Sequence, residues 1–128
     1  MEYNHSKETS LSFEEAIEKV KVELKKEGFG VLTEIDVKDT LKQKLNVDFK
    51  KYRILGACNP PFAYKALQAE EKIGVMLPCN VIVHEKENGK IEVACINPLY
   101  SMQIVNNKAL EEIGKEVSSK LQKVVNSF

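Results

Sequence analysis

The chain has 128 residues, of which 43% are hydrophobic and 30% charged, as expected for one soluble globular domain over residues 1–128. Basic and acidic residues balance at 19 each, so we expect no nucleic-acid partner, which would require a basic surface. No apolar run reaches the roughly 20 residues that cross a bilayer, so we expect no membrane partner. Three cysteines, an odd number, indicate free thiols in a reducing cytoplasm rather than a disulfide framework.

The first quarter of the chain predicts a weak strand followed by a helix. Residues 1–9 alternate weakly, as an edge strand can. Ser12 and Glu15 form a capping box that starts a helix, and Gly28 is placed to end it. Between them, apolar residues recur at helical spacing and predict one buried stripe: Phe13, Ala16, Ile17, Val20 and Leu24.

Residues 29–35 then predict a strand. Glu34 lies between apolar neighbours in it and could stand at the rim of a pocket, although a solvated strand carboxylate explains the same pattern. Asp36 can cap a short helix that ends at about residue 45. We expect this helix to be buried through three apolar residues: Val37, Leu41 and Leu45.

A Cys-Asn pair beside proline occurs twice, each time after an apolar run. The first pair, Cys58-Asn59, ends a predicted strand at residues 52–58 and precedes two prolines, which suit the first turn of a helix. Cys58 would then lie at or just before a helix N-terminus, where the helix dipole stabilises a thiolate. Gly56 within the strand indicates a bulge or a close backbone approach.

The second pair, Cys79-Asn80, follows Pro78 and an apolar run at residues 73–77 that predicts another short strand. We expect the fold to bring the two Cys-Asn pairs together. The residues after the second pair alternate as a strand does, so Cys79, Val81 and Val83 share one face of the predicted sheet.

Asn88-Gly89 predicts a hairpin between residues 79–87 and 90–96. A two-residue turn would place Ile82 opposite Cys95, so that Cys95 and His84 both point away from Cys79. Both faces of this hairpin carry apolar side chains, so a loop, a ligand or a second subunit should cover the second face. Part of that cover is expected from three residues that follow the hairpin: Leu99, Met102 and Ile104.

A long helix from about Asn107 closes the chain. Its apolar stripe consists of Leu110, Ile113, Val117, Leu121 and Val124. Gly114 within it costs about 1 kcal/mol relative to alanine, which indicates close packing at that point. A hairpin and further strands, flanked by two long helices, predict an α+β fold with a mostly antiparallel sheet.

Three blocks of the sequence resemble the family called domain of unknown function 302. They are GFGVLTEIDV at residues 28–37, ILGACNP at 54–60 and IGVMLPCNVIV at 73–83. The resemblance implies a TATA-binding-protein-like fold of β-α-β(4)-α order with short extra helices, in which a curved, mostly antiparallel sheet is backed by two main helices. It also implies a homodimer, but it supplies no reaction, ligand or cofactor.

The candidate site is a polar pocket formed by Cys58, Asn59, Cys79 and Asn80, with Glu34 at its rim. Such a pocket could bind a small ligand, or a soft metal through the thiols of Cys58 and Cys79. Two other classes of function stay open. One is an enzyme with Cys58 as nucleophile or redox thiol, and the other is a protein-interaction domain without small-molecule chemistry. In the plainest interpretation, both cysteines are buried apolar residues and both asparagines bond local backbone.

Overall fold

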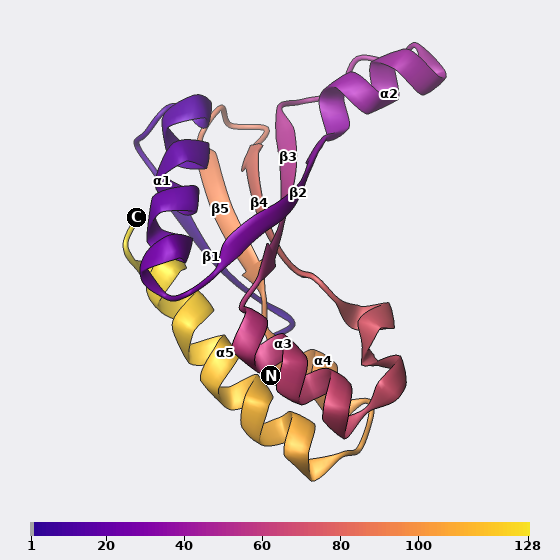
Figure 1. Ribbon diagram of the computed structural model, residues 1–128. Helices are drawn as coiled ribbons and strands as arrows, with labels where there is room; N and C mark the ends of the chain where they lie inside the picture. The colour runs from indigo at the N-terminus through magenta and orange to yellow at the C-terminus, as the bar shows by residue number, and fades with distance from the viewer. Residues whose placement is uncertain (1) are drawn as a thin grey trace.

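Five strands form one antiparallel sheet in the computed structural model, which describes residues 2–128 (Figure 1). In spatial order they are β1 (Asn4–Thr9), β5 (Ile91–Ile96), β4 (Cys79–Glu85), β3 (Tyr52–Cys58) and β2 (Gly30–Asp36). The helices are α1 (Phe13–Lys26), α2 (Val37–Leu45), α3 (Pro60–Ala69), the 3-10 helix η1 (Glu71–Met76), α4 (Pro98–Gln103) and α5 (Lys108–Asn126). The predicted α+β class and antiparallel sheet are confirmed, and the likeness to the TATA-binding-protein fold stays a prediction.

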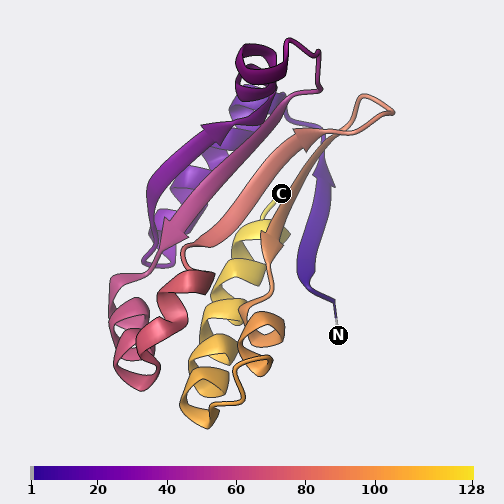
Figure 2. The ribbon, with the colours of Figure 1, turned by 90° about the vertical axis from the view of Figure 1, so that its right-hand side faces the viewer.

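The two long helices, α1 and α5, cover one face of the sheet, and the main core lies between these layers (Figures 1 and 2). α1 begins at the predicted capping box, in which the Glu15 N–H donates to the Ser12 hydroxyl oxygen at 3.1 Å. After α1, Gly28 adopts a φ of 86°, a conformation that favours glycine. The five apolar residues of the predicted stripe are all buried in this core.

Gly56 lies where three chain segments approach one another. The pairing of β2 with β3 shifts its register between Val31 and Thr33, which is a β-bulge beside Gly56. A Cβ atom at Gly56 would overlap the Thr33 hydroxyl and lie 2.8 Å from Cγ of Pro78. Of the two alternatives expected at this glycine, the close approach is confirmed, whereas the bulge lies opposite it in β2.

The hairpin between β4 and β5 is one residue longer than the sequence predicts. The Lys86 N–H donates to the Lys90 carbonyl at 2.8 Å, and Gly89 ends the three-residue turn with a φ of 82°. Because one extra residue shifts the pairing by one, Val81 faces Cys95, and Cys95 lies on the same face as Cys79. The expectation that these two cysteines point to opposite faces is wrong.

Residues 73–77 form no strand. Most of this run belongs to η1, which buries Ile73 and leaves Val75 89% exposed. A single buried residue per turn suits a 3-10 helix, whereas a strand would bury alternate residues. The predicted strand at this position is wrong for that reason, and the sheet has five strands.

α2 projects away from α1 and α5 (Figure 1). The helix itself and its Asp36 cap are as predicted, since the Asp39 N–H donates to Asp36 Oδ1 at 2.9 Å. The expected burial through Val37, Leu41 and Leu45 is wrong, because no residue of α2 is buried. β2 and β3 hold α2 at a position where the layer of α1 and α5 does not pack against it.

α4 packs against α5 rather than across the sheet. Met102 is buried in a second, smaller core with Ala66, Ile73 and Leu110, and Ile104 is 71% exposed, so the cover expected from this segment is absent. The outer face, meaning the sheet face turned away from α1 and α5, carries no helix of residues 2–128 (Figure 2). Its apolar side chains include Ile35, Tyr52, Ile54, Ile82 and Ala94.

Candidate functional site

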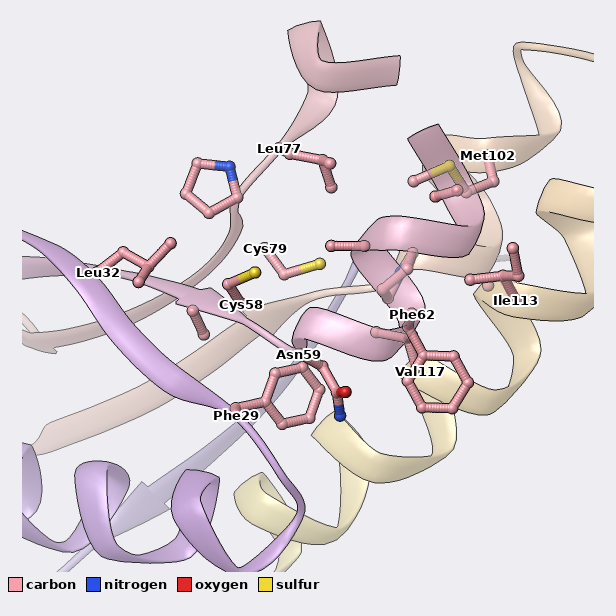
Figure 3. A pocket seen from close by; sticks show the side chains of 16 residues that line it. Phe29, Leu32, Cys58, Asn59, Phe62, Leu77, Cys79, Met102, Ile113 and Val117 are labelled. Atoms are coloured by element: carbon pink, nitrogen blue, oxygen red, sulfur yellow. The ribbon is translucent and has the colours of Figure 1, made fainter. Parts of the chain in front are cut away.

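A partly open cavity of about 270 Å³ lies beyond one end of the sheet, between α3, α4 and α5 (Figure 3). Most of its wall is apolar, and its larger lining side chains are Phe29, Leu32, Phe62, Leu77, Met102, Ile113 and Val117. Cys58, Asn59 and Cys79 also line it, so the structure brings together three of the five residues that the sequence nominates.

The cavity lies where α5 runs past the end of the sheet. The N-terminal part of this 19-residue helix extends beyond the ends of the strands (Figures 1 and 2). It presents Ile113, Gly114 and Val117 to the cavity. A Cβ atom at Gly114 would lie 3.2 Å from the carbonyl oxygen of Pro98 in α4, which confirms the close packing expected at this glycine.

The two thiols lie in one wall of the cavity because β3 ends where β4 begins (Figure 3). Ala57 pairs with Cys79, so Cys58 is one residue beyond that pair, and both cysteines are half-buried. Burial raises the pKa of the Cys79 thiol to about 11, and a negative charge on the neighbouring Cys58 acts in the same direction. Cys79 is therefore a neutral thiol at physiological pH.

Asn59 connects the end of α1 to the start of α3. Its Nδ2 donates to the carbonyl oxygen of Glu27 at 3.1 Å, and a Cβ atom at Gly28 would lie 3.2 Å from the same nitrogen. The side chain is 8% exposed and makes no capping hydrogen bond to α3, although Asn59 occupies its N-cap position. This amide positions the backbone around the cavity.

Glu34 and Asn80 lie outside the cavity wall. Arg53 Nη1 donates to Glu34 Oε1 at 2.8 Å, and Lys21 Nζ lies 3.2 Å from Oε2. The hydrogen bond from Arg53, assisted by Lys21, holds the pKa of Glu34 below its ordinary value. Glu34 is thus an ion-paired strand carboxylate. Asn80 is exposed on the outer face, opposite Gly56.

Cys95 and His84 do not reach the cavity either. Cys95 is 2% exposed, and burial raises the pKa of its thiol to about 12. His84 lies on the outer face, opposite to Cys79 as predicted, with Nε2 at 2.8 Å from Glu92 Oε1 and Nδ1 at 3.3 Å from Lys50 Nζ.

The family model described as "Domain of unknown function DUF302" matches residues 5–128. The chain belongs to the DUF302 family. It is similar to the crystal structure of an uncharacterized conserved DUF302 protein from Bacillus stearothermophilus, with 30% sequence identity, a TM-score of 0.92 and 98% of each chain covered. No curated protein matches the sequence. Across residues 2–128, none of the helices combines the length and apolar character that a membrane crossing requires.

The cavity of this DUF302 chain offers two thiols and one amide, and none of its lining residues is charged or carries an imidazole. Cys58 lies just before the N-cap of α3, as predicted, but no lining residue could serve it as a general base. Within residues 2–128, no group of three or more His, Cys, Asp or Glu side chains could hold a metal. The thiols of Cys58 and Cys79 are therefore the metal-ligating groups that this wall presents.

Sequence reasoning predicts a polar pocket in this DUF302 chain and misses the apolar wall. The stripe of α5 is predicted as core along its whole length, and the residues of α3 and α4 are not assigned to a site. Helix length does not reveal the cavity, because the predicted stripe from Leu110 to Val124 spans about 22 Å, no more than the predicted strands do.

Proposed function

We propose that this DUF302 chain binds a small, uncharged, mainly apolar molecule in the cavity beside Cys58 and Cys79. The observation that carries the proposal is a cavity of about 270 Å³ with an apolar wall. A cavity of about 150 Å³ accommodates benzene, so this larger one suits a fused two-ring compound or a short branched alkyl group. An ionic ligand is disfavoured, because none of the lining residues supplies an opposite charge.

The thiols of Cys58 and Cys79 give this site two soft, polarizable contacts. A soft metal ion is a second candidate occupant because these thiols are neighbours, but it would have to displace the proton of Cys79, whose pKa is about 11. A thiol-dependent enzyme using Cys58 has less support, since no base lines the cavity. We place the protein in a reducing cytoplasm, where free thiols persist.

Ligand binding can be measured with N-phenyl-1-naphthylamine, a neutral dye that fluoresces more strongly in apolar surroundings. The wild-type chain should bind this dye saturably. Ala63→Phe places a large side chain in the cavity and should weaken binding about tenfold or more. Lys65→Phe adds the same ring to the same helix at an exposed position outside the cavity wall, so it is the matched control and should bind normally.

Two results would contradict the proposal. One is the absence of saturable fluorescence enhancement with the wild-type chain. The other is equal dye affinity in folded Ala63→Phe and Lys65→Phe. A parallel titration with Cu(I) tests the second occupant, because uptake that is lost in Cys58→Ser and retained in Ala63→Phe would favour a metal over an apolar molecule.

We also propose that the protein is a homodimer joined through the outer face and α2. The outer face has a row of apolar side chains at its centre, in which Ile54 and Ile82 are half-buried and Ala94 is buried. Its ionic groups are paired within the chain, as in Lys86 with Glu8, and the net charge is zero, so two copies do not repel each other.

Area considerations indicate that α2 takes part in the dimer. Five strands spaced about 4.8 Å apart and about 20 Å long give a face of roughly 480 Å², whereas a stable interface needs about 800 Å² from each partner. A 9-residue helix without a buried side chain is also marginal alone in water. Packing of Leu45, Val47 and Phe49 on the second copy would supply the missing area and stabilise α2.

A further inference from the structure

We infer that Cys58 and Cys79 can form a reversible disulfide that ties the end of β3 to the start of β4 in the cavity wall. This inference is independent of the proposed ligand binding, since it depends only on the two thiols and their position in the sheet. Both side chains line the same wall, and they lie next to each other at the centre of Figure 3. Both are half-buried, so a small reagent can reach the pair.

The sheet register selects this pair of cysteines over the other combinations. Cys58 is one residue beyond the Ala57–Cys79 pair, which puts its Cα about 6 Å from that of Cys79, given the usual strand spacing and rise. Disulfides span Cα separations of about 4.4 to 6.8 Å. Cys95 pairs with Val81, two residues from Cys79, and such diagonal neighbours are about 7 to 8 Å apart. A Cys79–Cys95 bridge therefore does not fit, even though both residues share a face.

Strand alternation alone would send Cys58 and Cys79 to opposite faces of the sheet. The structure avoids this because β3 ends at Cys58, and the chain turns into α3 immediately afterwards. Cys58 is the last residue of β3, still paired with Gly30 of β2, and its side chain lines the cavity together with Cys79.

The bridge would close a loop that holds both α3 and η1. Phe62 and Ala66 from α3, with Leu77 after η1, form part of the cavity wall within this loop. Oxidation would therefore tether the segment that shapes one side of the cavity, and reduction would release it. A disulfide of this kind in a reducing compartment would be transient and would respond to the local redox state.

The reaction needs a low-molecular-weight disulfide as oxidant. The Cys58 thiolate attacks one sulfur of this reagent, which forms a mixed disulfide and expels one small thiolate. Cys79 then loses its proton to solvent, and its sulfur attacks the Cys58 sulfur and expels the second small thiolate. Two protein thiols are oxidised, and the reagent is reduced to two thiols. Because the pKa of Cys79 is about 11, the second step should accelerate as the pH rises.

The test is to incubate the reduced, full-length protein with oxidised glutathione, quench it with acid, unfold it in denaturant, alkylate the remaining thiols and measure masses. The expected product has lost about 2 Da, carries one alkyl group, on Cys95, and yields a peptide linked through Cys58 and Cys79. Dithiothreitol should reverse the change. The oxidised protein should melt about 5 to 10 °C higher than the reduced protein, since a closed loop restricts the unfolded chain.

Three single variants make the result specific. Cys95→Ser should oxidise as the wild type does, whereas Cys58→Ser and Cys79→Ser should stop at a glutathione adduct or not react. The inference is overturned if wild type ends as a glutathione adduct, keeps three alkylatable thiols, or links Cys79 to Cys95. The wild-type peptide map decides the matter even where a variant folds poorly.

Discussion

The three cysteines show how burial sets the chemistry of a single residue type within one chain. Cys95 lies in the main core, whereas Cys58 and Cys79 line the cavity. Burial raises the pKa of Cys79 to about 11 and that of Cys95 to about 12, above the ordinary value of 9.0. Both thiols are therefore protonated at neutral pH, and their contribution to stability must depend on pH in the alkaline range.

Raising the pH from about 8 to about 11 should destabilise the protein through these two thiols. As the pH passes 9, the unfolded chain loses the protons of Cys79 and Cys95, while the folded chain retains them up to pKa values of about 11 and 12. Their stabilising contribution is complete below pH 9 and is reduced by on the order of 2 kcal/mol per thiol at pH 11.

Urea unfolding in the presence of a phosphine reductant, at about pH 8 and about pH 10.5, measures this loss. Lysine and tyrosine residues also titrate here, so the control is the Cys79→Ala/Cys95→Ala double variant, in which the fall in unfolding free energy should be smaller. Equal falls in the two proteins would show that the thiols are not responsible.

At the scale of whole elements, the sequence predicts α1, α2, α3 and α5 well because their caps and apolar periodicity are local properties. Its errors concern the length of one turn and the contacts between distant segments. The hairpin turn is one residue longer than Asn88-Gly89 implies, and this moves Cys95 to the face of Cys79. The run at residues 73–77 has the composition of a strand, but it pairs with none of the five strands of the sheet. Similarly, no local feature of the α2 sequence indicates that this helix projects away from α1 and α5.

The same contrast between local properties and long-range contacts explains which residues of the site the sequence predicts. Cys58, Asn59 and Cys79 were found because their pattern is local, being two Cys-Asn pairs beside proline. Their apolar surroundings come from α3, α4 and α5, and their assembly depends on helix lengths and packing. Glu34 has an apolar neighbourhood in sequence but meets Arg53 from the next strand, which no local pattern shows.

The contact between α4 and α5 depends on Gly114. Gly114→Val would bring side-chain atoms against the α4 backbone, where a Cβ would already lie 3.3 Å from Cα of Leu99. We expect the free energy of unfolding to fall by about 1 to 3 kcal/mol. Ser119→Val, at an exposed position of the same helix, should change it by less than about 0.5 kcal/mol. Thermal and urea unfolding would measure this difference. Similar losses of unfolding free energy in the two variants would show that stability does not depend on the contact between α4 and α5.

At the scale of the whole molecule, the fold has one covered and one uncovered sheet face. α1 and α5 bury the inner face, while the outer face presents Ile54, Ile82 and Ala94 without a helix over them (Figure 2). The cavity lies past the end of the sheet and does not open through the middle of the outer face. The proposed dimerisation through that face and the proposed occupation of the cavity can therefore be tested separately.

Ile82→Asp should convert the proposed dimer into a folded monomer, because a carboxylate at the centre of the outer face would be desolvated without a partner in the dimer. The matched control is Val22→Asp, which places the same charge on the exposed side of α1, where valine is 56% exposed. Light scattering across micromolar concentrations should give twice the chain mass for wild type and Val22→Asp, and a single chain mass for Ile82→Asp.

Since the cavity lies elsewhere, the monomer should still bind the naphthylamine dye. A wild-type protein that is monomeric throughout this range would refute the dimer and leave the ligand proposal to be decided by the dye alone.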